Sequence, residues 1–219
     1  MNLINKIIAP FGVRLARAGR ASGSNSEIAT IERNKKDTLN QLWGDIAFKD
    51  EYKKNHESLY EGLLQIAKSE GLVDQAESII DVGCGPGYFL GLLDRIGFKG
   101  SLSGCDFAEA AILSASQQCA RADLFVHDIY LPLKQSYDLL FCMETLEHLL
   151  YPERAFANLL NSSKIAVLTV PEGRKDSFMG HINFWSPESW EIFCRQNAKS
   201  KDVVTRVFNG SKNLVAVIR

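Results

Sequence analysis

The sequence predicts an α/β fold in which helices cover both faces of a mainly parallel sheet. After Gly71, short runs of β-branched and other apolar residues alternate with helical stretches. The links between these segments are short, which favours parallel strands joined by helices. The first of these runs leads into a loop with glycines at Gly83, Gly85 and Gly87, as in a strand that turns directly into a helix.

The expected elements follow one another in order along the chain. Strands are expected at 78–82, 102–105, 124–126, 137–142 and 165–170. Helices are expected at 88–96, closed by Gly97, at 107–118, from Pro152 onward, and from the Ser186-Pro187 cap to about 197. The last two strands, 203–208 and 214–218, flank an Asn209-Gly210 turn signal, which favours an antiparallel pair at a sheet edge.

The chain before this domain divides into two further segments by composition. Residues 1–20 hold Lys6, Arg14, Arg17 and Arg20 but no acidic residue, and residues 21–26 are small and polar, as in a flexible joint. Residues 27–71 have helical spacing and are expected to form a cap on the domain at 72–219. The basic arm has three interpretations: a helix packed on its own domain or on the neighbouring subunit of a homodimer, a helix lying on a membrane surface, or a transit peptide.

The composition excludes several classes of protein. A net charge of -1 and a pI near 6.4 over 219 residues argue against an extensive nucleic-acid surface. The five cysteines are odd in number and form no CxxC pair, which indicates a reduced, cytoplasmic protein. No window approaches the roughly 18 apolar residues of a membrane-spanning helix, so we do not expect an integral membrane protein.

Polar groups follow the ends of the first three expected strands. Glycines after a strand let the backbone approach a ligand, and the next helix offers free N–H groups. Asp106 ends the second strand, where a carboxylate can accept both hydrogen bonds of a ribose diol. Asp128 ends the third strand, placed to accept from the exocyclic amine of a base, with Ile129 beside it as an apolar wall. These three strand ends therefore predict a ligand that contains a nucleoside.

Four segments at these positions carry the pattern of a known family. They are DVGCGPGYF (81–89), GCDFAEAAI (104–112), VHDIYLP (126–132) and YDLLFCMETLEHL (137–149). Together they resemble the class I methyltransferases that use S-adenosylmethionine, over roughly residues 60–219. The resemblance implies a Rossmann-like sheet of seven strands, mainly parallel, whose last strand is inserted antiparallel. The N-terminal sixty residues lie outside the family's pattern, and we expect their helices to form an extension of the domain.

The resemblance also implies S-adenosyl-L-methionine as the cofactor and a role for each matching residue. Asp81 helps to hold the methionine end, the glycine loop wraps it, Asp106 binds the ribose, and Asp128 binds the adenine. The expected cofactor-binding residues are Asp81, Gly83, Cys84, Gly85, Gly87, Asp106, Phe107, Asp128, Ile129, Met143 and Glu144.

Two other functions stay open at this point. One is an NAD-type oxidoreductase, although Tyr88 stands where the dinucleotide fingerprint GxGxxG has its third glycine. The other is a cofactor-binding subunit without activity of its own.

The segment after the fourth expected strand holds the candidate catalytic groups. If a helical turn begins after Met143, Glu144, Glu147 and His148 lie on one face at i, i+3 and i+4, and His181 follows the next strand. Such an oxygen-rich set with one or two imidazoles suits Mg²⁺. The ExxEH pattern resembles the metal site of small-RNA 2′-O-methyltransferases and a loop of ubiquinone-pathway O-methyltransferases. The expected catalytic residues are His148, Glu147 and His181, and the expected metal ligands are Glu144, Glu147, His148 and His181.

Structural roles for the same side chains remain as alternatives. Glu144 could line the cofactor site, Glu147 could face solvent, and His148 could pack under the following helix. His181 could stack on Phe184 or Trp185.

The acceptor is expected between the N-terminal helices and residues 173–190, a segment rich in glycine and aromatic residues. Phe178, Phe184 and Trp185 could stack on a ring or a sugar face, or pack in the core. The segment loosely resembles small methyltransferases of glycans and lipid-linked sugars. We therefore expect methyl transfer to a small-molecule or saccharide acceptor, at oxygen.

Overall fold

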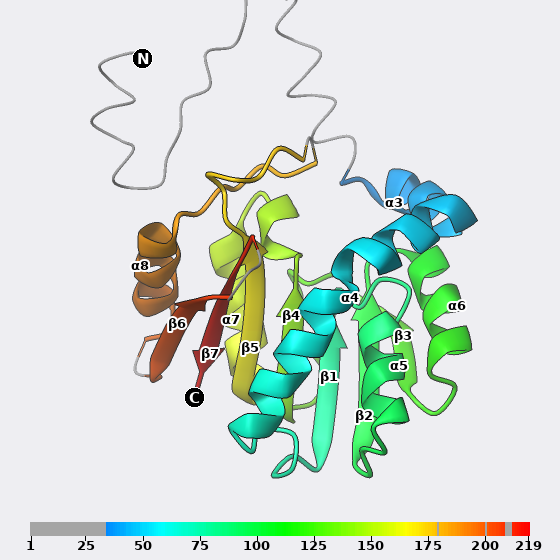
Figure 1. The fold of residues 1–219 in the computed structure, drawn as a ribbon, viewed down its shortest axis with the longest axis horizontal. Helices are drawn as coiled ribbons and strands as arrows, with labels where there is room; N and C mark the ends of the chain where they lie inside the picture. The colour runs from blue at the N-terminus through cyan, green and yellow to red at the C-terminus, as the bar shows by residue number, and fades with distance from the viewer. Residues whose placement is uncertain (1–33, 179, 200, 209–211) are drawn as a thin grey trace, which may run out of the picture.

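The computed structural model describes residues 34–178, 180–199, 201–208 and 212–219, which form one seven-stranded sheet flanked by helices (Figure 1). The predicted basic arm, the joint and the Asn209-Gly210 turn lie outside these residues. None of the helices within them is long and apolar enough to cross a membrane.

The sheet has the strand order β3-β2-β1-β4-β5-β7-β6. Its strands are β1 (Ser78–Val82), β2 (Ser101–Asp106), β3 (Asp123–Val126), β4 (Tyr137–Met143), β5 (Ser163–Pro171), β6 (Val203–Val207) and β7 (Asn213–Ile218). The first five strands pair in parallel, and β7 is antiparallel to both of its neighbours. The mainly parallel sheet with an antiparallel last strand is confirmed. The antiparallel pair at the sheet edge is confirmed as well, with β7 inserted between β5 and β6.

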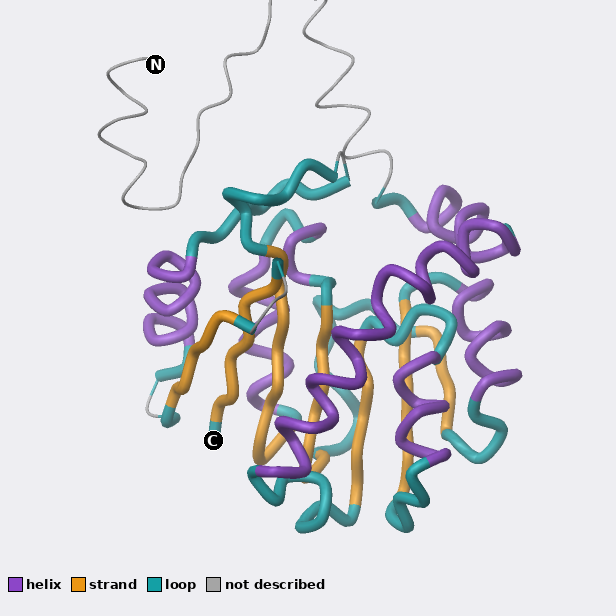
Figure 2. The backbone as a smooth tube through the Cα atoms, viewed as in Figure 1, coloured by secondary structure: helices purple, strands orange, loops and turns teal. Residues whose placement is uncertain are grey.

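Helices cover the two faces of the sheet (Figure 2). They are α3 (Lys36–Gly44), α4 (Ile46–Ser69), α5 (Tyr88–Arg95), α6 (Glu109–Gln118), the short 3₁₀ helix η2 (Leu146–His148), α7 (Pro152–Asn161) and α8 (Pro187–Asn197). Two predicted helix ends are confirmed. Gly97 follows α5 with a left-handed φ of +79°, and Ser186 caps α8, its hydroxyl accepting from the backbone N–H of Ser189.

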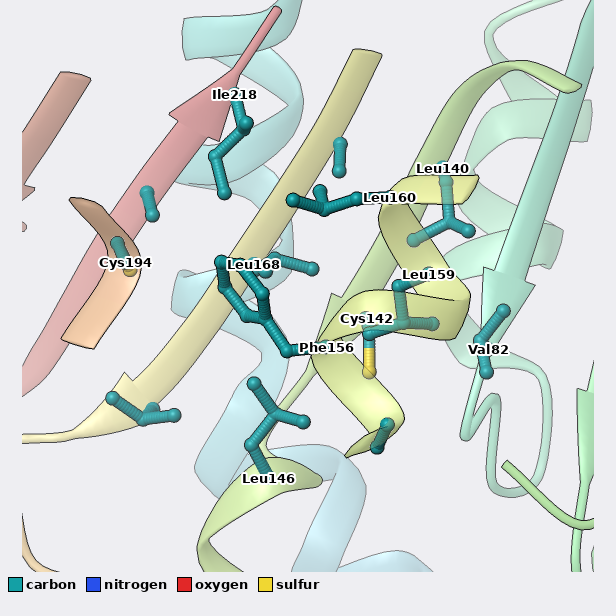
Figure 3. Close-up of a cluster of buried hydrophobic side chains, with 14 of the residues drawn as sticks. Val82, Leu140, Cys142, Leu146, Phe156, Leu159, Leu160, Leu168, Cys194 and Ile218 are labelled. Atoms are coloured by element: carbon teal, nitrogen blue, oxygen red, sulfur yellow. The ribbon is translucent and has the colours of Figure 1, made fainter. Parts of the chain in front are cut away.

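The central strands β1, β4, β5 and β7 are buried on both faces, so consecutive side chains enter different core clusters. In β4, Leu139 and Phe141 pack with residues of α4 and α5, whereas Leu140 and Cys142 pack with residues of α7 and α8. Figure 3 shows the second cluster, in which Phe156 of α7 lies beside Leu168 of β5. This alternation explains why the strand sequences are almost continuously apolar.

The N-terminal helices belong to the same packed unit. Leu63 of α4 is fully buried in the cluster that contains Ile79 and Phe89. From α3, the Lys36 ammonium pairs with Glu109 at 2.6 Å, and the Asn40 side-chain oxygen accepts from the backbone N–H of Ala110 at 3.0 Å. Helix α3 therefore packs on the start of α6, above the carboxyl ends of the neighbouring strands (Figure 1).

Candidate active site

The glycine loop after β1 has the backbone conformation that its sequence suggested. Gly83, Gly85 and Gly87 have φ angles of +75°, +50° and +79°. A Cβ atom at Gly83 would lie 2.4 Å from the hydroxyl of Thr145, and one at Gly87 would lie 2.7 Å from Cα of Ala115. Larger residues would therefore both strain the loop and displace its neighbours.

Asp106 lies at the end of β2 and holds this loop in place. One carboxylate oxygen accepts from the backbone N–H of Gly85 and the other from that of Ala108, each at 2.9 Å. Burial raises the pKa of Asp106, and these hydrogen bonds oppose the rise. Each oxygen has two lone pairs, so both retain capacity for a ribose hydroxyl.

The other predicted cofactor residues line the same edge of the sheet. Cys84 and Met143 are buried, and Phe107 is half exposed beneath the Lys36 ammonium, 5.8 Å from the ring centroid. One oxygen of Asp128 accepts from the backbone N–H of Tyr130 at 2.9 Å. Ile129 packs against the core cluster of α7 and α8.

Asp81 is the most deeply buried of the predicted cofactor-binding aspartates. Its side chain is 1% exposed, and its Oδ1 atom has no hydrogen-bond partner. Burial, together with the charge of Asp106, raises the pKa of Asp81 to about 8. An unpartnered buried oxygen at a ligand site is a natural partner for a donor on the ligand.

A second cluster forms where the β5–α8 segment crosses η2. The backbone N–H groups of Ile182 and Asn183 both donate to the carbonyl of Glu147, at 2.9 and 3.0 Å. The Asn183 side chain donates to the carbonyl of Leu149 at 2.6 Å. These bonds bring His181 to η2, although the neighbouring Gly180 lies 32 residues after His148 in the chain.

Glu147, His148 and His181 converge in this cluster. Their possible ligand atoms all lie within 4.8 Å of one another. The Glu147 carboxyl is fully buried and neither of its oxygens has a hydrogen-bond partner; Nε2 of His181 lies 3.8 Å from Oε1. The alternative in which Glu147 faces solvent is therefore wrong.

The hydrogen bonds of the two imidazoles fix their orientation. Nδ1 of His148 lies 3.1 Å from the carbonyl of Gly180, which as a pure acceptor makes Nδ1 the protonated nitrogen. Nδ1 of His181 lies 2.5 Å from the carboxylate of Asp176. In both rings Nε2 is then left for another partner. His181 contacts the rings of His148 and Phe178, at centroid distances of 4.6 and 4.8 Å, rather than Phe184 or Trp185.

The burial of the cluster sets its charge. Burial raises the pKa of Glu147 well above its usual value, and the charges of Glu144 and Asp176 act in the same direction. Burial also lowers the pKa of His148 to about 4, assisted by His181. His148 is therefore neutral near pH 7, and Glu147 holds a proton unless a cation takes its place.

Glu144 departs from the expected helical turn. Its backbone is left-handed, with φ +49°, and the helical segment begins only at Leu146. The Glu144 side chain accepts from the Thr169 hydroxyl at 3.0 Å instead of joining Glu147 and His148. Burial raises its pKa to about 7, opposed by hydrogen bonds from Thr169 and Asn213. Among the described residues, the metal-type cluster thus consists of Glu147, His148 and His181.

The aromatic residues near this cluster divide into two groups. Trp185 is 9% exposed and packs on Trp190 and Phe193, so it belongs to the core. Phe178 and Phe184 are 48% and 42% exposed. These two rings lie on the surface of the segment that carries His181.

Sequence reasoning missed several residues that shape the site. Asp176 orients His181, and the Asn34 side chain donates to the carbonyls of His148 and Gly180, both at 3.1 Å. Helix α4 contributes Tyr52, whose hydroxyl lies 2.9 Å from that of Tyr60. The spacing of four in Tyr52, His56 and Tyr60 could have indicated a polar stripe on one face of that helix.

Comparison with protein families identifies the pattern carried by these residues. Residues 53–200 match a family model described as a methyltransferase domain. This range includes the glycine loop, both buried aspartates and the Glu147 cluster. No curated protein sequence is similar enough to count as a match.

Solved structures share the fold at low sequence identity. The methyltransferase domain of bacterial CtHen1 is 19% identical and has a TM-score of 0.63, with 75% of this chain and 98% of that chain covered. Magnesium protoporphyrin IX methyltransferase from Synechocystis PCC 6803, with bound SAH, is 15% identical and has a TM-score of 0.63, with 88% of this chain and 99% of that chain covered. The DhpI–SAH complex is 13% identical and has a TM-score of 0.68, with 87% of this chain and 96% of that chain covered.

Proposed function

The chain belongs to the class I methyltransferases that use S-adenosylmethionine, and from this premise we propose that it methylates a hydroxyl group of a small molecule or saccharide. The family match favours this activity over the NAD-type oxidoreductase. The single observation that supports an oxygen acceptor is the buried Glu147 carboxyl, which lies without hydrogen-bond partners beside two imidazoles.

The strand ends fit the parts of the cofactor in sequence. We assign the glycine loop and Asp81 to the methionine end, Asp106 to the ribose, and Asp128 with Ile129 to the adenine. The unpartnered Oδ1 of Asp81 and the free lone pairs of Asp106 are the observations that support this fit. The cofactor supplies a methyl group on a sulfonium, which is already electrophilic. The protein's task is then to position the acceptor and to remove its proton.

Glu147, His148 and His181 are assigned to the acceptor end. The set consists of one carboxylate and two imidazoles, which is richer in nitrogen than the sequence suggested because Glu144 turns away. Such a set suits Mn²⁺, Fe²⁺, Co²⁺ or Zn²⁺ at least as well as Mg²⁺. A divalent ion held there would compensate the buried carboxylate and lower the pKa of a bound hydroxyl.

In the absence of a bound ion, His148 is the proposed general base; with an ion bound, Nε2 of His148 would be a ligand, and the ion would lower the pKa of the acceptor hydroxyl. The Nδ1–H group of His148 is held by the carbonyl of Gly180, and the low pKa of His148 keeps Nε2 unprotonated near pH 7. The exposed Phe178 ring lies in edge contact with His148, at a centroid distance of 6.3 Å, where it can cover a sugar face or an aromatic ring. The cluster therefore suits a compact acceptor with adjacent hydroxyls.

The test is transfer of a labelled methyl group from S-adenosylmethionine to a panel of catechols and glycosides with vicinal diols. Each acceptor is paired with its mono-O-methylated analogue. We expect labelling of the free diols only, with loss of activity after chelation and recovery with Mn²⁺ or Mg²⁺. Labelling on nitrogen or carbon would overturn the oxygen assignment, and full activity after exhaustive chelation would overturn the metal. Cofactor binding without transfer to any acceptor in cell extracts would instead favour the inactive-subunit alternative.

A further inference from the structure

Two tyrosine hydroxyls of α4 form a hydrogen-bonded pair inside the structure. The hydroxyls of Tyr52 and Tyr60 lie 2.9 Å apart, and Tyr60 is 8% exposed. His56 stacks on the Tyr52 ring at a centroid distance of 3.9 Å and holds it from one side. Trp43 contacts the same ring edge-on, at 5.0 Å. The Tyr52 side chain is thus fixed by its neighbours.

Counting hydrogens shows that the pair has a donor to spare. Two hydroxyls carry two hydrogens, and only one of them lies in the bond between the two oxygens. The other hydrogen can be donated to a third group. Burial raises the pKa of both Tyr52 and Tyr60, so both remain protonated and keep this donor.

The pair lies close to the part of the site assigned to the methionine end. The Tyr60 ring contacts Phe89 of α5 at a centroid distance of 5.8 Å, and the carboxyl groups that act on Tyr52 when ionised are Glu144, Asp81 and Glu147. The Tyr88 hydroxyl donates to the carbonyl of Lys49 at 3.2 Å, which ties α4 to the first residue of α5. Trp43 packs over the glycine loop, because a Cβ atom at Gly85 would lie 3.4 Å from its ring.

The two kinds of free group in this region are complementary to an amino acid. Oδ1 of Asp81 is a buried acceptor without a partner, and the tyrosine pair has a free donor. An α-ammonium group needs an acceptor, and an α-carboxylate needs a donor. We propose that Tyr52 donates to the α-carboxylate of the cofactor's methionine end, with Tyr60 as its positioning partner and Asp81 on the α-ammonium. This inference rests on the proposed function, because it needs the cofactor to lie in this crevice.

The experiment compares two ligands that differ only in the carboxylate. Isothermal titration calorimetry measures the affinity of the full chain for S-adenosylhomocysteine and for its decarboxylated analogue, which keeps the amine. Wild-type protein should bind S-adenosylhomocysteine about tenfold more tightly, or more. In Tyr52→Phe this preference should largely disappear, because only the carboxylate-bearing ligand loses its donor. Tyr60→Phe should reduce this preference partly. Asp81→Asn should lower the affinity for both ligands, because both carry the amine.

A substitution that only impairs folding changes the apparent affinity for both ligands equally, so it leaves the ratio of the two affinities unchanged. Tyr137→Phe is the matched control, since that hydroxyl bonds to Gln135 at the opposite end of β4. An unchanged preference in Tyr52→Phe, or a wild-type protein that binds both ligands equally, would overturn the inference and leave the methyltransferase assignment intact. If wild-type protein bound neither ligand, the cofactor site itself would be wrong.

Discussion

The His181 imidazole donates from Nδ1 to the carboxylate of Asp176 over 2.5 Å, and this bond fixes which nitrogen of His181 faces Glu147. The two residues are only five positions apart, on the segment between β5 and α8. A carboxylate behind a histidine orients the ring and makes its other nitrogen a better base or ligand. Asp176 thereby supports the Glu147 cluster through His181, without being one of its three possible ligands.

The first prediction concerns this positioning role. Asp176→Asn should lower turnover by roughly 10- to 100-fold, since loss of such a partner misdirects the ring. The affinity for S-adenosylhomocysteine should change little, because the hydrogen bonds of Asp176 go to His181 and to the backbone N–H of Phe178. Steady-state methyl transfer and calorimetry measure the two effects. Asp123→Asn, at the exposed start of β3, is the control, and equal turnover in both variants would refute the role.

The second prediction concerns Asp106, which both holds the glycine loop and is assigned to the ribose. Asp106→Ala should weaken binding of S-adenosylhomocysteine by about 1.5–3 kcal/mol, the value of hydrogen bonds to a charged group. It should also lower the free energy of unfolding by about 1–3 kcal/mol, since the N–H groups of Gly85 and Ala108 lose their acceptor.

The control for Asp106 is Asp138, a carboxylate at the opposite, amino-terminal end of the parallel strands. Asp138 accepts from the backbone N–H groups of Glu77 and Ser78, at 2.9 and 3.0 Å. Asp138→Ala should therefore destabilise the protein without weakening cofactor binding. Unchanged affinity in Asp106→Ala would refute the ribose assignment, whatever its effect on stability.

The sequence predicted the sheet well because the relevant signals are local. Apolar runs of strand length, Gly97 and the Ser186 cap each act within a few residues, so they are readable without tertiary information. The conformation of Glu144 was not readable in this way. Its local sequence allows a helical turn, but bonds from Thr169 and Asn213, on two other strands, draw its side chain away. The partnership of His181 with η2 likewise depends on long-range backbone bonds.

The third prediction is a pH dependence caused by Asp81. The folded-state pKa is raised to about 8 from an ordinary value of 3.8, so between these values the folded protein binds more protons than the unfolded chain. The free energy of unfolding of the ligand-free protein should then fall as pH rises through this window, by at most about 1.4 kcal/mol per pH unit from this group. Asp81→Asn lacks this contribution.

Urea denaturation of both proteins at several pH values measures the difference. The stability of Asp81→Asn relative to wild type should increase between about pH 5 and pH 8, since only the wild-type carboxyl resists ionisation there. Parallel stability curves for the two proteins would show that Asp81 is not protonated in the fold.

The last prediction separates a metal ligand from a structural carboxyl at Glu147. Burial raises the pKa of Glu147, so the metal-free protein holds it protonated. The neutral, isosteric Glu147→Gln should melt at or above the wild-type temperature at pH 7, because only the wild-type chain must take up a proton to fold. Mn²⁺ should raise the melting temperature of the wild type, because an ion that binds only the folded state stabilises it. Mn²⁺ should not raise the melting temperature of Glu147→Gln, which cannot supply a carboxylate.

The control variant is Glu153→Gln, at an exposed position in the first turn of α7, which should respond to Mn²⁺ like wild type. A retained Mn²⁺ response in Glu147→Gln would remove Glu147 from the ligand set, and a large loss of metal-free stability would mean that the native carboxyl is ionised and paired in solution.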